Sequence, residues 1–157
     1  MVEEKTGFKI KPDTHAQGIL RFVVENWLEI DGFCEGDEKW VESAALIVLE
    51  ITNWGNGRLR ASFVLGPCDD QDVRTAIYDK VLENEKIKIG RRTRTPNEKW
   101  KHLSSTDIQQ QHVYVQAEDK DTPAQELAEK AILKFADFLK RDLGEYDAIV
   151  RETFIAN

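Results

Sequence analysis

The sequence predicts an α+β fold, a single domain with a mainly antiparallel sheet of about four to five strands and helices packed on one face. Three observations lead to this prediction. The run Asn53-Trp-Gly-Asn-Gly separates an apolar segment from a strictly alternating one, as in a β-hairpin. A helical pattern follows Gly66-Pro67, and Thr122-Pro123 opens a further segment with apolar residues at helical spacing. The resulting order is helix, hairpin, helix, strands, helix.

The N-terminal part is predicted to contain a long helix. Residues 1–12 are polar and are expected to form a flexible lead-in, so that the single α+β domain spans residues 13–157. Asp13 or Thr14 offers an N-cap, because its side-chain oxygen can accept a hydrogen bond from a free backbone amide. Apolar residues at helical spacing continue this helix to about Glu29. They are Ile19, Phe22, Val23, Trp27 and Ile30.

A hairpin of two strands is predicted at the centre of the chain. Residues 41–51 are rich in Ile, Val and Leu and form a short run, which is typical of a strand buried on both faces. Asn and Gly in the following turn tolerate the positive φ that tight hairpins require. Apolar and polar residues then alternate over residues 58–65, so one face is apolar and the other polar. The apolar face has Leu59, Ala61, Phe63 and Leu65, and the polar face has Arg58, Arg60 and Ser62.

A second helix is expected after the hairpin. Asp69 or Asp70 caps it, both carboxylates suit the positive end of the helix dipole, and the pattern ends near Glu83. A connection containing basic residues and proline follows. Short strands are expected at 86–89, 99–104 and 112–117.

The closing helix has several agreeing start signals. Thr122 is the expected N-cap, Pro123 suits the first helical position, and Gln125 can complete a capping box. Its apolar stripe predicts a helix that runs to about Leu143.

Composition indicates a soluble cytoplasmic protein. The chain has 157 residues, of which 41% are hydrophobic and 32% charged, unlike a disordered chain. The longest apolar run, residues 44–49, is too short to span a membrane, and no signal-peptide pattern is seen, so we expect no membrane association. Two cysteines, Cys34 and Cys68, argue against a disulfide framework or a cysteine-based zinc site.

Charge is distributed unevenly along the chain. Residues 86–101 contain seven lysines and arginines and one glutamate, which gives +6, whereas the whole chain carries −7 and the remainder therefore −13. Arginine binds phosphate as a fork, and an aromatic ring can stack on an unpaired base, so this basic loop predicts contact with an anion. A solvated loop that pairs with acidic helices of the same chain is the alternative. The candidate anion-binding residues are Arg58, Arg60, Lys86, Lys88, Arg91, Arg92, Arg94, Lys99, Trp100 and Lys101.

A metal-dependent nuclease centre is a weaker alternative. Asp107, Glu118 and Lys120 resemble the carboxylates and lysine that hold divalent metal ions and cut phosphodiesters. The same acid-x-lysine pattern also occurs at residues 3–5 and 37–39, as expected in a chain so rich in these residues.

Histidines, cysteines and glycines add no catalytic motif. His102 and His112 are cross-strand neighbours if their segments pair, but two histidines without a third ligand do not make a zinc site. Cys68 lies near a helix start, which favours a thiolate, although no partner can be assigned to activate it. The glycines at 55 and 57 belong to a hairpin turn and not to a phosphate-binding loop.

Two of the four tryptophans fit a core role. Trp27 and Trp40 are expected to pack inside, whereas Trp54 sits at the hairpin tip. An exposed tryptophan at such a tip is a candidate contact for a partner, and packing under a neighbouring loop is the alternative.

Three runs lie in the middle of the chain, at residues 46–51, 58–67 and 72–78. They are followed by Lys99-Trp-Lys and by a long helix with Phe135-Ala-Asp-Phe-Leu-Lys-Arg-Asp-Leu. Together these segments resemble a region of bacterial and phage proteins of the PD-(D/E)XK nuclease superfamily. In those proteins the region lies C-terminal to the nuclease core. The likeness covers about residues 41–148, and no carboxylate cluster of a nuclease core precedes it. The resemblance therefore implies an accessory module without the catalytic centre.

We therefore expect a non-catalytic binding module without a cofactor. Arg91, Arg92 and Arg94 would contact phosphates and Trp100 would stack on a base, so nucleic acid is the favoured partner and an acidic protein the other. A protein-interaction module, such as an inhibitor, adaptor or chaperone-like protein, is an alternative. Small acidic α+β proteins of similar element order include the type III secretion chaperones, which wrap an unfolded segment of a partner.

Overall fold

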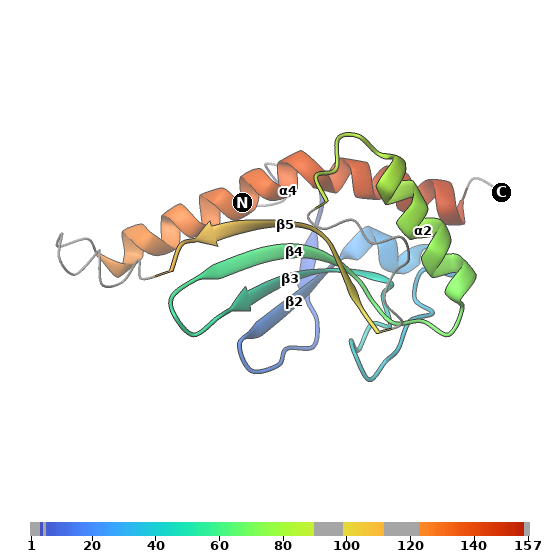
Figure 1. The fold of residues 1–157 in the computed structure, drawn as a ribbon, viewed down its shortest axis with the longest axis horizontal. Helices are drawn as coiled ribbons and strands as arrows, with labels where there is room; N and C mark the ends of the chain where they lie inside the picture. Colours follow the sequence, from blue (N-terminus) through green and yellow to red (C-terminus); the bar gives the residue numbers. More distant parts are fainter. Residues whose placement is uncertain (1–3, 5, 90–98, 112–122, 156–157) are drawn as a thin grey trace.

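The computed structural model describes the chain except residues 1–3, 5, 90–98, 112–122 and 156–157. It confirms an α+β fold with one five-stranded antiparallel sheet, in which strands that follow in sequence are neighbours in space (Figure 1). The strands are β1 (Ile10–Pro12), β2 (Ile19–Val24), β3 (Ile47–Asn53), β4 (Leu59–Leu65) and β5 (Lys101–Gln109). The helices are the 3-10 helix η1 (Glu25–Glu29) and the α-helices α2 (Gln71–Glu83) and α4 (Ala124–Phe154).

The prediction of a long N-terminal helix is wrong. Its segment forms β2 and the short helix η1, and β1, which pairs with β2, lies in the segment expected to be a lead-in. Gly18 has a φ of +73°, and a Cβ there would lie 3.1 Å from the carbonyl oxygen of Asn53. The turn at Gly18 directs the chain into the sheet, where Phe22 contacts Phe135 of α4. The apolar residues of this segment fit a helix and a strand about equally well, and pairing with β3 favours the strand.

The central hairpin is confirmed. Asn53 lies opposite Leu59, and Gly55 and Gly57 both have positive φ in the turn. The alternation of β4 is also confirmed, because the Phe63 ring stacks on Tyr146 at a centroid distance of 4.0 Å and contacts Phe138 at 5.4 Å. The apolar face of β4 is therefore the face that α4 covers (Figure 1).

The segment before β3 differs from the prediction. The expected strand over 41–51 begins only at Ile47, and residues 41–46 precede it as turns and loop. Val41 and Leu46 are nevertheless buried. Trp40 is half-buried, and its ring packs against the backbone at Gly66. A Cβ added to Gly66 would lie only 2.2 Å from this ring.

Helix α4 extends well beyond the predicted end. It continues from Leu143 through Gly144 to Phe154. A glycine inside a helix costs about 1 kcal/mol relative to alanine. Burial of Tyr146, Ile149 and Val150 continues the apolar stripe and outweighs that cost. The N-cap is Pro123, and the predicted cap Thr122 lies outside the described residues.

A buried polar network fixes α4 to β5. The Ser104 hydroxyl donates to the Asp142 carboxylate at 2.8 Å, and the Tyr146 hydroxyl donates to Ser104 at 3.0 Å. Burial raises the pKa of Tyr146 far above its usual value of 10.0. Burial thus favours the protonated phenol, which donates to Ser104 and ties the helix to the sheet.

Helix α2 begins where the sequence predicts. The Asp70 side chain accepts hydrogen bonds from the amides of Asp72 and Val73, as an N-cap does. Its inner face is buried through Ile77 and Val81, and α2 lies against the C-terminal half of α4 (Figure 1).

Replacing Asp70 by alanine is expected to lower the free energy of unfolding by about 1 kcal/mol, because two amides lose their acceptor. Urea denaturation followed by circular dichroism measures this. Asp70→Asn, which keeps an acceptor oxygen, should recover most of the loss. An equal loss in both variants would contradict the capping role.

The remaining predicted strands have mixed outcomes. Over 86–89 the structure has only an isolated bridge between Ile89 and Ser104. The strand expected at 99–104 is longer and runs to Gln109. The strand expected at 112–117 lies outside the described residues. Across the described ranges, no helix is both long and apolar enough to cross a lipid bilayer.

Candidate anion-binding site

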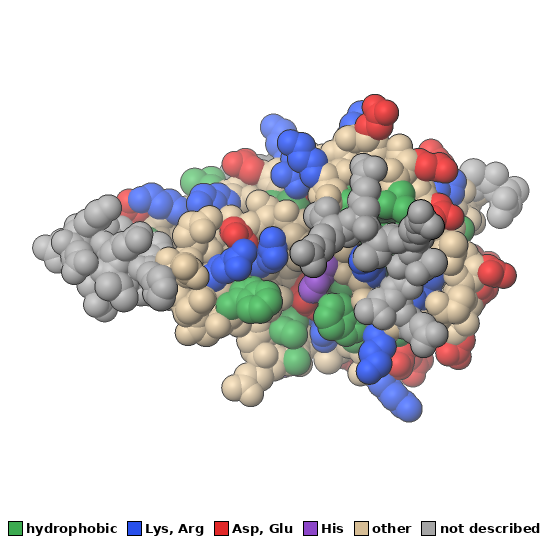
Figure 2. Space-filling model, viewed as in Figure 1, with side chains coloured by type: hydrophobic (Ala, Val, Ile, Leu, Met, Phe, Trp, Pro, Cys, Tyr) green, Lys and Arg blue, Asp and Glu red, His purple; other side chains and the backbone are tan. Residues whose placement is uncertain are grey.

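A groove of about 750 Å³ crosses the face of the sheet that is turned away from α4. We call it the basic groove. Arg60 from β4, Lys88, and Lys101 and His102 from β5 line it. Among the described residues that line it there is no carboxylate. Figure 2 shows lysine and arginine side chains beside apolar ones over β4 and β5. The groove is therefore suited to a negatively charged ligand.

Strand register brings these side chains together. The alternation of β4 turns Arg60 and Ser62 away from the core, and β5 places Ser105 opposite Ser62. The two serine hydroxyls are hydrogen-bonded at 2.9 Å and also line the basic groove. A register shift between Ser62 and Val64 then brings His102 opposite Val64.

Asp107 is held by two arginines at the edge of this face. Arg58 binds it in a fork, with Nε–Oδ1 at 3.2 Å and Nη2–Oδ2 at 2.9 Å. Arg60 Nε lies 3.4 Å from the same Asp107 Oδ1. Two cations share one carboxylate, so the cluster keeps a net charge of about +1. The Arg60 side chain is 41% exposed and can present this charge to a ligand.

Glu50 holds a second cluster on the same face. Its side chain is only 8% exposed and accepts a hydrogen bond from Arg21 Nε at 3.1 Å, while His102 Nε2 lies 3.4 Å away. Burial acts to raise the pKa of Glu50, but the contacts with His102 and Arg21 outweigh it, so the pKa lies below the usual value of 4.5. The carboxylate is thus neutralised by Arg21 and does not repel an anion in the basic groove.

This low pKa predicts an acid-sensitive contribution to stability. Since the pKa of Glu50 is lower in the folded state, its contribution is complete above about pH 4.5 and is lost as the pH falls through the folded value. Urea denaturation of the parent and of Glu50→Gln at pH 7 and pH 3 measures it. The difference between the two proteins should be large at pH 7 and should shrink at pH 3. A difference independent of pH would contradict the prediction.

Only some of the predicted anion-binding residues lie together in the structure. Arg60, Lys88, Trp100 and Lys101 line the basic groove, with Arg58 beside it. Lys86 instead points elsewhere and pairs with Glu145 of α4, with Nζ–Oε1 at 2.9 Å. Lys99 is exposed. Arg91, Arg92 and Arg94 lie outside the described residues.

Of the metal-nuclease candidates, only Asp107 lies in the described part of the chain. Asp107 is neutralised by its two arginines, and Glu118, Lys120 and His112 lie outside the part that the structure describes. Within that part, no group of three histidine, cysteine or acidic side chains is placed to hold a metal ion.

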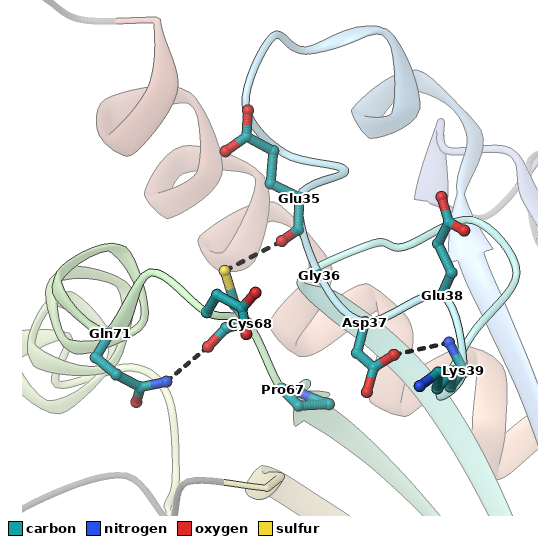
Figure 3. Close-up of a pocket in the computed structure, with 9 residues that line it drawn as sticks. Glu35, Gly36, Asp37, Glu38, Lys39, Pro67, Cys68 and Gln71 are labelled. Carbon is teal, nitrogen blue, oxygen red and sulfur yellow. Dashed lines mark hydrogen bonds between the residues drawn. The ribbon is translucent and has the colours of Figure 1, made fainter.

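A second hollow, of about 680 Å³, has the opposite charge. Figure 3 shows Glu35, Asp37, Glu38 and Lys39 on one side of it, and Cys68 opposite. The Cys68 thiol donates to the carbonyl of Glu35 at 3.2 Å. Burial is the main cause that raises the pKa of this thiol, so the thiolate that the helix start suggested is disfavoured. An acidic hollow of this kind repels anions.

A third hollow is apolar. It has a volume of about 420 Å³ and lies between the hairpin end of the sheet and the N-terminal half of α4. Leu20 and Ile132, which are 51% and 43% exposed, lie along it.

No protein-family model, curated protein or solved structure matches this chain. The resemblance to the region that follows a PD-(D/E)XK nuclease core stays a prediction. The function is therefore inferred from the geometry of the site.

Sequence reasoning missed some parts of the site. His102 and the pair Ser62–Ser105 depend on the register of β5, which shifts twice along β4. The pairing of Arg21 with Glu50 depends on β2, a segment for which the sequence predicted a helix. The alternation that turned Arg58, Arg60 and Ser62 to the polar face of β4 was the sequence signal for this face.

Proposed function

We propose that this chain is a non-catalytic module that binds an anionic partner, nucleic acid, in the basic groove. The observation that carries the proposal is a groove lined by Arg60, Lys88 and Lys101 and, within the described residues, by no carboxylate. The chain as a whole is acidic, with a net charge of −7. A local basic surface on an acidic protein attracts a polyanion at one place and repels it elsewhere.

The ion pairs of Glu50 and Asp107, two acids on the same face, support this proposal. Glu50 is neutralised by Arg21 and Asp107 by Arg58, which reduces the repulsion of an anion by these two carboxylates. Lys88 is exposed, and Arg60 is partly so. Exposed cations that the fold already holds in place can approach a phosphate without prior rearrangement of the chain, which favours binding.

Fluorescence anisotropy with a labelled oligonucleotide tests the proposal. The parent should bind at low salt, and Lys88→Ala with Lys101→Ala should weaken binding about 10-fold, because each removes a phosphate contact. The matched control is Lys130→Ala with Lys140→Ala, two exposed lysines of α4 on the other side of the sheet. Equal weakening in both pairs, or no binding by the parent, would overturn the proposal.

The apolar hollow favours a second candidate function, a protein-interaction module. Half-exposed Leu20 and Ile132 would contribute apolar area to such an interface. A pull-down in high salt that recovers one protein in stoichiometric amount, and loses it with Ile132→Glu, would support this function. Loss of the same protein with Lys88→Ala would instead assign the interaction to the basic groove.

A further inference from the structure

The basic groove also has an aromatic side chain toward each end. These two rings indicate which class of nucleic acid the groove binds. We infer, on the basis of the proposed function, that the groove binds single-stranded nucleic acid as an extended chain along β4. One unpaired base stacks on Trp54 and another stacks on Trp100. Arg60, Lys88 and Lys101 contact the intervening phosphates.

Trp54 and Trp100 are the exposed members of the tryptophan set. Their exposed fractions are 57% and 47%, whereas Trp27 is 1% exposed and donates a hydrogen bond to Asp147. Both exposed rings line the same groove. A base in a duplex is already stacked on its neighbours, whereas an unpaired base can stack on such a ring.

The spacing of the two tryptophans indicates a chain and not a single nucleotide. The Trp54 amide donates to the carbonyl of Arg58, so Trp54 lies at the start of β4. Trp100 precedes Lys101, which lies opposite Leu65 at the end of β4. With a rise of about 3.3 Å per residue, the strand between them spans about 20 Å. A ligand that reaches both rings is an oligonucleotide, and single-strand sites of this kind hold about four nucleotides or more.

The groove between the rings offers polar groups to such a chain. Arg60 lines the groove, and the hydroxyls of Ser62 on β4 and Ser105 on β5 line it as well. His102 contacts the Trp100 ring edge-on, with centroids 5.3 Å apart, and fixes its orientation. Arg60 and the two hydroxyls therefore lie on the strands between the two rings, and Lys101 lies next to Trp100.

The test compares ligands and variants in one anisotropy assay. The ligands are a labelled 12-nucleotide oligo-dT, an oligo-U of equal length, a 12-base-pair duplex and dTMP as competitor. The single strands should bind about 10-fold more tightly than the duplex, and dTMP should compete only weakly. Trp54→Leu and Trp100→Leu should each weaken single-strand binding about 10-fold, as the loss of one stacked base does. Leu133→Ala, at a half-exposed residue of α4, is the control.

The outcomes separate this inference from the proposed function. Equal affinity for duplex and single strand, together with unchanged binding by the tryptophan variants, overturns the inference, and a loss with Lys88→Ala would still support the proposed function. An effect of Trp100→Leu without one of Trp54→Leu overturns the extended path. No binding of any ligand overturns both. Unchanged circular dichroism of the variants excludes misfolding as the cause. Quenching of tryptophan fluorescence in the parent by oligo-dT is the expected sign of a base on an exposed tryptophan ring, and its absence would count against the stacking.

Discussion

Replacing Phe63 by alanine is expected to lower the free energy of unfolding by about 3–5 kcal/mol. Phe63 is fully buried in β4 and contacts Tyr146 and Phe138 of α4. Its removal leaves a cavity between the sheet and the helix, and adjacent aromatic rings close such a cavity poorly. Urea denaturation followed by tryptophan fluorescence gives the change. Because Phe63 lies on the face opposite the basic groove, the folded fraction should bind ligand as the parent does.

Phe63→Leu is the matched control for this prediction. It retains much of the apolar volume, so its cost should be smaller, about 1–1.5 kcal/mol. A cost below about 1 kcal/mol for Phe63→Ala would contradict the position of α4 over the apolar face of β4.

Reversing three charges in the basic groove is expected to weaken binding of an oligonucleotide by about 100-fold or more. The variant is Arg60→Glu, Lys88→Glu and Lys101→Glu. Each substitution removes a cation from the groove and places an anion where phosphates would lie. Anisotropy at low salt measures the loss.

Two further variants make this prediction decisive. Lys88→Glu with Lys101→Glu leaves the Arg60–Asp107 pair intact, so it separates lost binding from a disturbed sheet. Lys130→Glu with Lys140→Glu changes the net charge of the chain equally, but on α4. Binding that falls equally in both double variants would mean that total charge, and not the basic groove, governs affinity.

The parts of the fold that could be predicted are those with local signals. The turn after Asn53 and the cap at Asp70 both need particular residue types, and both were located correctly. The segment around Phe22 satisfies helical and strand spacing alike, and only pairing with β3 decides for a strand. The closing helix was predicted to end near Leu143, but burial of Tyr146, Ile149 and Val150 carries it on to Phe154.

The site was predictable only in outline. The basic residues and Trp100 were visible in sequence, as was the outward position of Arg60. Lys86, in contrast, pairs with Glu145, which lies far along the chain on α4. Trp54 was a candidate partner contact, and the sequence did not link it to the basic residues. Its place in the same groove follows from the pairing of β4 with β5.

The salt dependence of oligonucleotide binding tests the central claim most directly. For a single strand, the slope of log K against log salt is about −0.7 per phosphate contacted. Three contacts, by Arg60, Lys88 and Lys101, predict a slope of at least about −2 for the parent, and Lys88→Ala with Lys101→Ala should make it shallower by about 1.4. An identical slope in parent and variant, or the absence of binding at low salt, would contradict the basic groove as the binding site.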